Sequence, residues 1–240
     1  MNAQPAAQLL ASPRRYDARV VSVEEIGGDT RLIRVDIGTA SAHRAGQYAH
    51  LLAPGFDPRP FSIANAPDGG TLEFHIKGTG RGLTQHIFDD WQAGRAITVE
   101  LPFGDHFWRP SERPLLALAG GVGVAPMKAI LEAHFAHAAH SPAHLYWGVR
   151  DVAHLYLDPK FAALRDARPE FRYVPLLGEN PLGAPYRTGY LAPALQADFK
   201  TLAGFNIYIA GPRAMIEATL PALNALGAEK DCLFSDSFGG

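Results

Sequence analysis

The stretch AGGVGVAPMKAI, residues 119–130, decides the fold of the second half of the chain. It reads as the end of a buried strand, a glycine-rich turn and a helix with Pro126 in its first turn, where a missing N–H costs nothing. The free amides of the turn and the positive end of the helix dipole suit such a segment to phosphate. It follows neither the GxGxxG spacing nor a Walker loop, so by itself it is weak evidence for a nucleotide site.

Four apolar runs around this turn alternate with helical stretches and predict a parallel sheet covered by helices. They are PLLALAG (114–120), AHLYWG (143–148), FRYVPLLG (171–178) and FNIYIAG (205–211). Every run ends in glycine, and these glycines recur about 30 residues apart, the length of a strand–helix–strand unit. Ligands of an open parallel sheet bind outside the carboxyl ends of its strands, where glycine lets the backbone approach a ligand. The pattern favours a nucleotide crevice over four ordinary strand ends, and a second strand–turn–helix segment, YIAGPRAMIEA (208–218), supports it.

The first half of the chain reads as short strands separated by Gly, Pro and Asp, with no long helix between them. The runs are YDARVVSVEEI (16–26), TRLIRVDI (30–37), QYAHLLA (47–53), RPFSIAN (59–65), TLEFHIK (71–77) and AITVEL (96–101). Six such runs predict a small antiparallel barrel or sandwich. One stretch, GRGLTQHIFDDW (80–91), instead predicts a glycine turn followed by a short helix.

The chain of 240 residues is long enough for two domains. We expect a flexible leader over residues 1–15, a barrel domain over 16–109 and an α/β domain over 110–240. The single cysteine, Cys232, excludes an intrachain disulfide and an iron–sulfur cluster held by four cysteines of this chain.

The net charge and the lengths of the apolar runs limit the kinds of partner that the chain can bind. The net charge of −2 gives no general attraction to nucleic acid or to an anionic membrane. No apolar run approaches the roughly 18–20 residues of a membrane span, and the N-terminus lacks a secretory pattern. We therefore expect a cytoplasmic protein that binds neither nucleic acid nor membrane.

The stretch RPFSIANAP (59–67) places a cation, an aromatic ring and a hydroxyl side by side in Arg59, Phe61 and Ser62. A guanidinium grips phosphate through two parallel hydrogen bonds and never loses its charge. The turn GRGLTQ (80–85) can add backbone amides at a helix start. A solvated Arg59, a core ring at Phe61 and a local cap at Thr84 are the alternatives for these residues.

Four motifs in order carry a resemblance: Arg-Pro-Phe-Ser, Gly-x-x-Thr, Gly-Gly-Val-Gly-Val-Ala-Pro and Ala-Gly-Pro-x-x-Met. From about residue 16 to its end, the chain resembles the ferredoxin–NADP reductase superfamily. It is most similar to bacterial NAD(P)H–flavin reductases and to the flavin and pyridine-nucleotide portion of oxygenase reductases. HLYWGVRDVAHLY (144–156) and DCLFSDSF (231–238) fit that group. The resemblance implies an antiparallel β-barrel that binds flavin, followed by a Rossmann-like α/β domain with a parallel sheet that binds NAD(P).

The resemblance also implies roles on the flavin side. Arg59 would hold the flavin phosphate, Phe61 would lie along the isoalloxazine ring, and the hydroxyl of Ser62 would lie near flavin N5 as the one catalytic group. The remaining residues implied on this side, some through their backbone alone, are Pro60, His75, Ile76, Lys77, Gly82, Leu83 and Thr84.

On the nucleotide side, the resemblance implies a nicotinamide wall, an adenosine region and a far wall. These comprise Gly121, Val122 and Gly123; Val149 and Arg150; and Gly211 and Pro212. Asp236 and Phe238 match the family's C-terminal acidic residue and the aromatic ring that often covers the flavin. The chain departs from the family at three places, with Val122 for a common Thr, Ala210 for a common Cys, and two glycines after Phe238.

The implied activity is hydride transfer from NADH or NADPH to FAD, with FMN as the alternative flavin. Glu179 follows the third parallel strand and favours NADH, because a carboxylate repels a 2′-phosphate. Arg150 either favours NADPH or stacks on the adenine ring, and NADH is the expected preference. Electrons would pass to free flavin or to a partner such as a separate iron–sulfur or oxygenase protein. Two alternatives remain: an electron-transfer subunit of a larger redox complex, and a nucleotide-binding protein without flavin.

Several histidines and tryptophans have simpler explanations than function. His134, His137 and His140 would lie on a solvated helix surface and predict no metal site. His50, His106 and His154 have no motif around them. The three tryptophans are expected to be core or domain-interface rings: Trp91, Trp108 and Trp147.

Overall fold

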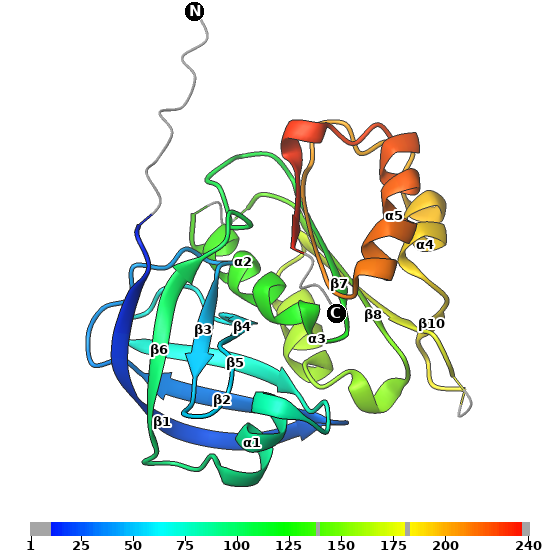
Figure 1. The fold of residues 1–240 in the computed structure, drawn as a ribbon. Helices are drawn as coiled ribbons and strands as arrows, with labels where there is room; N and C mark the ends of the chain where they lie inside the picture. Colours follow the sequence, from blue (N-terminus) through cyan, green and yellow to red (C-terminus); the bar gives the residue numbers. More distant parts are fainter. Residues whose placement is uncertain (1–10, 138–139, 181–182, 237–240) are drawn as a thin grey trace, which may run out of the picture.

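The computed structural model describes residues 11–137, 140–180 and 183–236. It contains two six-stranded sheets, one from each half of the chain, as the two patterns of apolar runs predict. Figure 1 shows the first sheet in blue and cyan beside the second sheet with its helices. In the part of the chain that the structure describes, no helix has the length and apolar character needed to cross a membrane.

The first sheet is antiparallel, in the strand order β4-β3-β6-β1-β2-β5. Its strands are β1 (Arg14–Gly27), β2 (Thr30–Asp36), β3 (Tyr48–Leu52), β4 (Arg59–Ser62), β5 (Thr71–Lys77) and β6 (Ala96–Phe103). A bridge between Ile63 and Phe74 joins the β4 end to β5, so the sheet curls into a barrel. The short helix α1 (Gly82–Asp90) confirms the helix expected after GRGLTQ.

The barrel closes because alternate side chains along its strands are apolar and point inward. On β5, Leu72, Phe74 and Ile76 are fully buried in the barrel core. Strand β1 begins at Arg14, two residues earlier than the expected strand, because Arg14 and Arg15 already pair with β6.

The second sheet has the order β10-β9-β8-β7-β11-β12, and all its pairings are parallel. Four strands match the glycine-ended runs: β7 (Leu115–Gly120), β8 (Ala143–Val149), β9 (Phe171–Leu177) and β11 (Asn206–Ala210). The edge strands β10 (Arg187–Thr188) and β12 (Leu233–Asp236) do not show the apolar-run pattern, because both are short, β10 is exposed and β12 is only partly buried.

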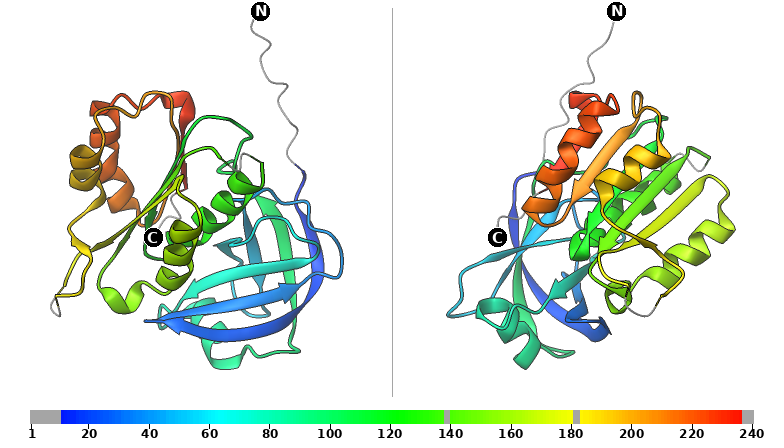
Figure 2. Two further views of the ribbon diagram at one scale, coloured as in Figure 1. Left: turned by 180° about the vertical axis from the view of Figure 1, so that it is seen from behind. Right: turned by 90° about the vertical axis from the view of Figure 1, so that its right-hand side faces the viewer.

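Helices cover both faces of the second sheet. The helices α2 (Val124–His137) and α3 (Asp158–Ala167) lie on the face toward the barrel, and α4 (Leu191–Asp198) and α5 (Arg213–Ala225) lie on the opposite face (Figures 1 and 2). Each face has its own apolar core, with Ile130 of α2 in one and Leu195 of α4 in the other. Helix α2 is therefore placed between the sheet and the barrel.

The expected solvated surface of α2 is wrong for one histidine. His134 is 1% exposed, and its Nε2 lies 3.3 Å from the carbonyl oxygen of Ser141, whereas His137 and His140 are exposed. His134 is buried because α2 has apolar neighbours on the sheet side and the barrel side, which a one-sided helix pattern does not reveal. Trp91 and Trp147 are core rings, as expected.

Candidate functional site

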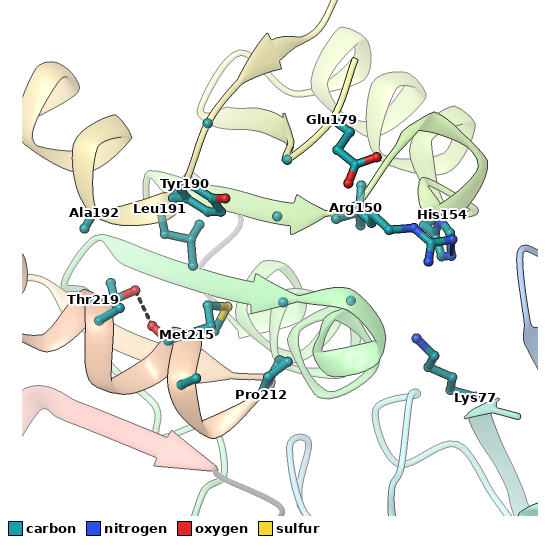
Figure 3. Close-up of a pocket in the computed structure, with 18 residues that line it drawn as sticks. Lys77, Arg150, His154, Glu179, Tyr190, Leu191, Ala192, Pro212, Met215 and Thr219 are labelled. Atoms are coloured by element: carbon teal, nitrogen blue, oxygen red, sulfur yellow. Dashed lines mark hydrogen bonds between the residues drawn. The ribbon is translucent and has the colours of Figure 1, made fainter. Parts of the chain in front are cut away.

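A cavity of about 600 Å³ opens at the carboxyl edge of the parallel sheet, a size typical of small-molecule sites. Gly120, Gly148 and Gly178, which end three of the predicted runs, line it. The start of α5 contributes the far wall through Pro212, Ala214, Met215, Ala218 and Thr219. Lys77 of β5 is the one barrel residue among its lining residues (Figure 3). The cavity thus lies where the sequence predicts a nucleotide crevice.

Strand register brings the glycines together. Gly120 lies opposite Gly148, and Ala119 lies opposite Ala210, so the turns after β7, β8 and β11 meet at one edge. Gly121 has φ +52°, and a Cβ on it would meet no atom within 4 Å. The glycine turn therefore presents bare backbone to open space, as a site for a flat ring or a phosphate requires.

The side chain of Trp147 holds the glycine turn after β7 in place through a hydrogen bond. The ring is fully buried, and its Nε1 donates a hydrogen bond of 2.9 Å to the carbonyl oxygen of Gly121. Val122 and Gly123 belong to the same turn, which forms a short 3-10 helix before α2. Val122 leaves the turn without the hydroxyl that a threonine would bring.

The two ends of the cavity differ in charge. Figure 3 shows Lys77, Arg150 and His154 gathered at one end, and Tyr190 and Thr219 at the other. Arg150 lies 3.2 Å from His154 Nε2, and Asp151 accepts from both residues. The hydrogen bond from His154 lowers the pKa of Asp151 below its usual value. The cationic end can hold an anionic group, while Glu179 brings a carboxylate beside Arg150.

Except for Lys77, which lines the cavity, the predicted flavin residues lie on the barrel outside it. In the β3–β4 pairing, Tyr48 is opposite Ser62 and Ala49 is opposite Phe61. Pro60 and Ser62 are half-buried, and Phe61 packs partly against the barrel core. In the described part of the chain, neither the exposed Arg59 side chain nor the Ser62 hydroxyl has a hydrogen-bond partner. Both groups are free to hold a ligand.

The other predicted flavin residues offer backbone rather than side chains. Ile76 is fully buried, and the His75 ring points into the domain interface, where its Nδ1 lies 3.2 Å from the Tyr156 hydroxyl. At the start of α1, Leu83 and Thr84 are buried, and the Thr84 hydroxyl donates to the carbonyl oxygen of Arg81. No side chain caps this helix, so its first amides, including that of Gly82, have no capping partner.

The C-terminal strand brings a carboxyl group toward the barrel. Asp236 pairs with Ala210 on β11, and its Oδ2 is buried without a hydrogen-bond partner in the described residues. Burial and the charge of Asp105 raise the pKa of Asp236 to about 7. Burial, Asp236 and Asp105 also raise the pKa of Tyr48, the residue opposite Ser62. Phe238 lies outside the described residues.

These residues fit the two cofactors that the sequence implies. The unpaired guanidinium of Arg59 and the uncapped start of α1 suit flavin phosphate. The open glycine edge and the cationic end of the cavity suit a dinucleotide. Of the predicted nucleotide residues, Gly121, Val149, Arg150 and Pro212 line the cavity. Gly123 and Gly211 lie next to these lining residues, where the turns after β7 and β11 touch backbone to backbone.

Three groups of lining residues were not predicted: His154, the segment 189–192 and the residues of α5. His154 has no motif around it and enters the cavity only because the 3-10 helix at Val152–His154 follows β8. The segment 189–192 reaches the cavity from the loop before α4. The residues of α5 could have been inferred, since a helix that follows a strand-end turn begins at the ligand edge.

Comparison with known proteins agrees with the two sheets. The oxidoreductase FAD-binding domain family matches residues 17–108, and the oxidoreductase NAD-binding domain family matches residues 117–220. The FAD-binding match over the barrel argues against a nucleotide-binding protein without flavin.

Individual relatives give the same picture. The NAD(P)H-flavin reductase of Aliivibrio fischeri is 31% identical, over 92% of this chain and 98% of that protein. The reductase component of the Pseudomonas putida naphthalene 1,2-dioxygenase system is 30% identical, over 97% of this chain and 72% of that protein. The crystal structure of the Amycolatopsis cytochrome P450 reductase GcoB is 31% identical with a TM-score of 0.89, over 95% of this chain and 71% of that chain. This chain, an oxidoreductase with an FAD-binding barrel and an NAD-binding α/β domain, therefore belongs to the ferredoxin–NADP reductase superfamily, together with NAD(P)H-flavin reductases and oxygenase reductase components.

Proposed function

We propose that this chain binds NAD(P)H in the cavity and FAD along β4 and α1, and reduces the flavin. One observation carries the proposal: the cavity lies where the glycine edge of the parallel sheet meets Lys77 of the barrel. When bound, the two cofactors supply hydride transfer from nicotinamide to flavin, and the protein aligns them. In this proposal the flavin domain spans residues 16–109 and the nucleotide domain spans 110–240.

On the barrel side, Arg59 holds the flavin phosphate together with the first amides of α1. Phe61 presents the edge of its ring that is not packed into the core. Ser62 donates or accepts a hydrogen bond at flavin N5, because its hydroxyl is half-buried and unpaired among the described residues. Backbone groups of His75 and Ile76 complete the support.

On the nucleotide side, Gly121 gives the nicotinamide ring access to the interface, since no side chain among the described residues comes within 4 Å of a Cβ built on it. Lys77 and Arg150 hold the phosphates at the cationic end, and His154 positions the Arg150 guanidinium. Val149 and Pro212 form apolar walls. Glu179 accepts a ribose hydroxyl, which favours NADH over NADPH.

Two electron acceptors are compatible with this site. In the first, the chain reduces free flavin, as the name of the Aliivibrio fischeri relative states for that protein. In the second, it passes electrons to a separate iron–sulfur or oxygenase protein, in line with its similarity to the naphthalene dioxygenase reductase component. We also propose a cytoplasmic location, because a chain with a single cysteine has no intrachain disulfide of the kind typical of oxidising compartments.

Anaerobic mixing tests the proposal. The purified chain is mixed with FAD and then with NADH or NADPH, and loss of the absorbance of oxidised flavin is followed. Bleaching supports the proposal, and its absence with both nucleotides contradicts it. Many turnovers with excess free flavin identify a flavin reductase. A reaction that stops after one turnover and resumes only when a partner protein is added identifies the second candidate.

A further inference from the structure

A buried ammonium group joins the two domains. Lys128 of α2 is 5% exposed, and its Nζ has three acceptors at hydrogen-bond distance. These are Glu73 Oε1 at 3.0 Å, the carbonyl oxygen of Ala64 at 2.9 Å and Glu132 Oε1 at 3.0 Å. Glu73 and Ala64 belong to the barrel and Glu132 to α2, so all three N–H donors are used and two of them cross the interface.

Glu73 also contacts His75, two residues further along β5. Its Oε1 also lies 3.1 Å from His75 Nε2, and its side chain is 14% exposed. Burial opposes its ionisation, but the hydrogen bonds from His75 and Lys128 and the charge of Lys128 lower the pKa of Glu73 to about 2. An ionised Glu73 can only accept, so His75 Nε2 donates to it.

His75 connects Glu73 to Tyr156 of the α/β domain through a second hydrogen bond. Burial lowers the pKa of His75, and a neutral ring that donates from Nε2 must accept at Nδ1. The Tyr156 hydroxyl, 3.2 Å away, is then the donor. The Tyr156 ring packs edge-on against Trp147 with ring centroids 5.3 Å apart, and Trp147 holds the carbonyl of Gly121. A continuous set of contacts thus runs from Lys128 to the glycine turn.

The same residues connect both walls of the cavity. Glu73 and His75 lie on the strand that ends at Lys77, the barrel residue of the cavity, and Trp147 holds Gly121 on the sheet side. We infer that Lys128, with Glu73 and His75, is an interdomain positioning device that sets the distance between the nicotinamide wall and the flavin strand. This inference rests on the proposed hydride transfer between the domains.

Geometry rather than stability explains why charged groups are used here. A buried ion pair contributes little net stability compared with apolar side chains of the same volume, because both charges lose their hydration. The two directed hydrogen bonds from Lys128 to the barrel, in contrast, define one relative position of α2 and the barrel strands, which an apolar contact does not. Hydride transfer depends steeply on such alignment.

The test compares Lys128→Met with the double variant Glu73→Gln/Lys128→Met, which leaves no unpaired buried charge. Each folded variant is measured well below its melting temperature, for the single-turnover rate of flavin reduction and for the dissociation constants of FAD and NADH. Both variants are expected to slow reduction by about 10- to 100-fold. Both dissociation constants are expected to stay within about threefold of the wild-type values.

A second measurement uses the cofactor-free chain. The amide of Ala66 donates to Glu132 Oε2 at 3.2 Å, so its hydrogen exchange reports the same interface. Exchange at Ala66 and in the glycine turn 121–123 is expected to accelerate in both variants. The matched control is Lys160→Met, because Lys160 contacts Glu132 from outside and its side chain is 49% exposed. The control should retain wild-type rates and exchange.

Three results would overturn the inference. The first is a wild-type reduction rate in the double variant. It would mean that Lys128 only neutralises the charge of Glu73. The second is a loss of affinity for FAD or NADH that is as large as the loss of the reduction rate. The third is unchanged exchange at Ala66 and the glycine turn. Failure of the wild-type chain to reduce flavin would instead contradict the proposed function, and should Lys128→Met fail to fold, the double variant carries the test.

Discussion

Gly123 lies so close to Ala210 that a Cβ on Gly123 would be 2.3 Å from the Ala210 carbonyl oxygen. The neighbouring obstacles are also backbone atoms, namely the Ala210 carbonyl carbon at 2.6 Å and the Gly211 nitrogen at 2.8 Å. The turn after β7 and the turn after β11, which contribute Gly121 and Pro212 to the cavity lining, therefore touch backbone to backbone.

The first prediction concerns this contact. Gly123→Ala should lower the free energy of unfolding by about 1–3 kcal/mol, because backbone atoms cannot move aside as a flexible side chain would. It should also weaken nucleotide binding by moving apart the two turns that contribute to the cavity lining. Thermal unfolding and NADH titration measure the two effects.

Gly148→Ala is the matched control for the first prediction. Its Cβ would have its nearest neighbour, the Ala119 carbonyl oxygen, at 3.8 Å, an ordinary contact. Its stability should stay within about 0.5 kcal/mol of wild type. Equal melting temperatures for Gly123→Ala and Gly148→Ala would contradict the described packing.

The second prediction concerns Ser62. Ser62→Ala should slow flavin reduction by about 100-fold, because a positioned hydrogen bond at the reacting nitrogen is lost. The dissociation constant of FAD should change by less than about threefold, since Arg59 and α1 hold the phosphate. Single-turnover kinetics and flavin titration separate the two quantities. Ser22→Ala on β1, which is half-buried like Ser62 but lies outside the predicted flavin site, serves as the control, and an unchanged reduction rate in Ser62→Ala would remove Ser62 from the mechanism.

The third prediction concerns nucleotide choice. Glu179→Gln should raise kcat/KM for NADPH relative to NADH by about 3- to 10-fold, because a like charge next to the 2′-phosphate is removed. Steady-state kinetics with both nucleotides measure the ratio. Asp166→Asn, an exposed carboxylate on α3 outside the cavity, should leave the ratio unchanged. A wild-type ratio in Glu179→Gln would place the ribose elsewhere.

The fourth prediction concerns pH and Asp236. The ordinary pKa of this group is 3.8 and the folded value is about 7, so the folded state binds a proton that the unfolded state releases between these values. The contribution of Asp236 to stability is therefore full below about pH 4 and is lost as the pH rises through about 7. Asp236→Asn should match wild type near pH 4 and exceed it by about 1–3 kcal/mol near pH 9.

Denaturant unfolding from about pH 4 to about pH 9 measures this difference. Asp231→Asn is the control, because Asp231 is exposed near the same end of the chain. A constant difference between Asp236→Asn and wild type across this range would show that the carboxyl group does not titrate as described.

Local sequence patterns determined most of the architecture. Alternating apolar residues gave the barrel strands, and glycine-ended apolar runs gave β7, β8, β9 and β11, because these signals depend only on neighbours along the chain. Short edge strands such as β10 carry too few residues to show a period. The buried His134 was missed for a different reason, since the pattern of one helix does not reveal a second layer packed against it.

The nucleotide half of the site was predictable and the domain interface was not. A glycine at the end of a parallel strand signals a ligand edge wherever the rest of the chain lies, so the sequence by itself determined Gly120, Gly148 and Gly178 as the cavity rim. The entry of His154 into the cavity depends on the 3-10 helix that follows β8, whereas the contact of Lys128 with Glu73 depends on how the two sheets dock. Docking is fixed by which buried charges find partners across the interface, and that pairing joins residues far apart in sequence, so only the tertiary structure decided it.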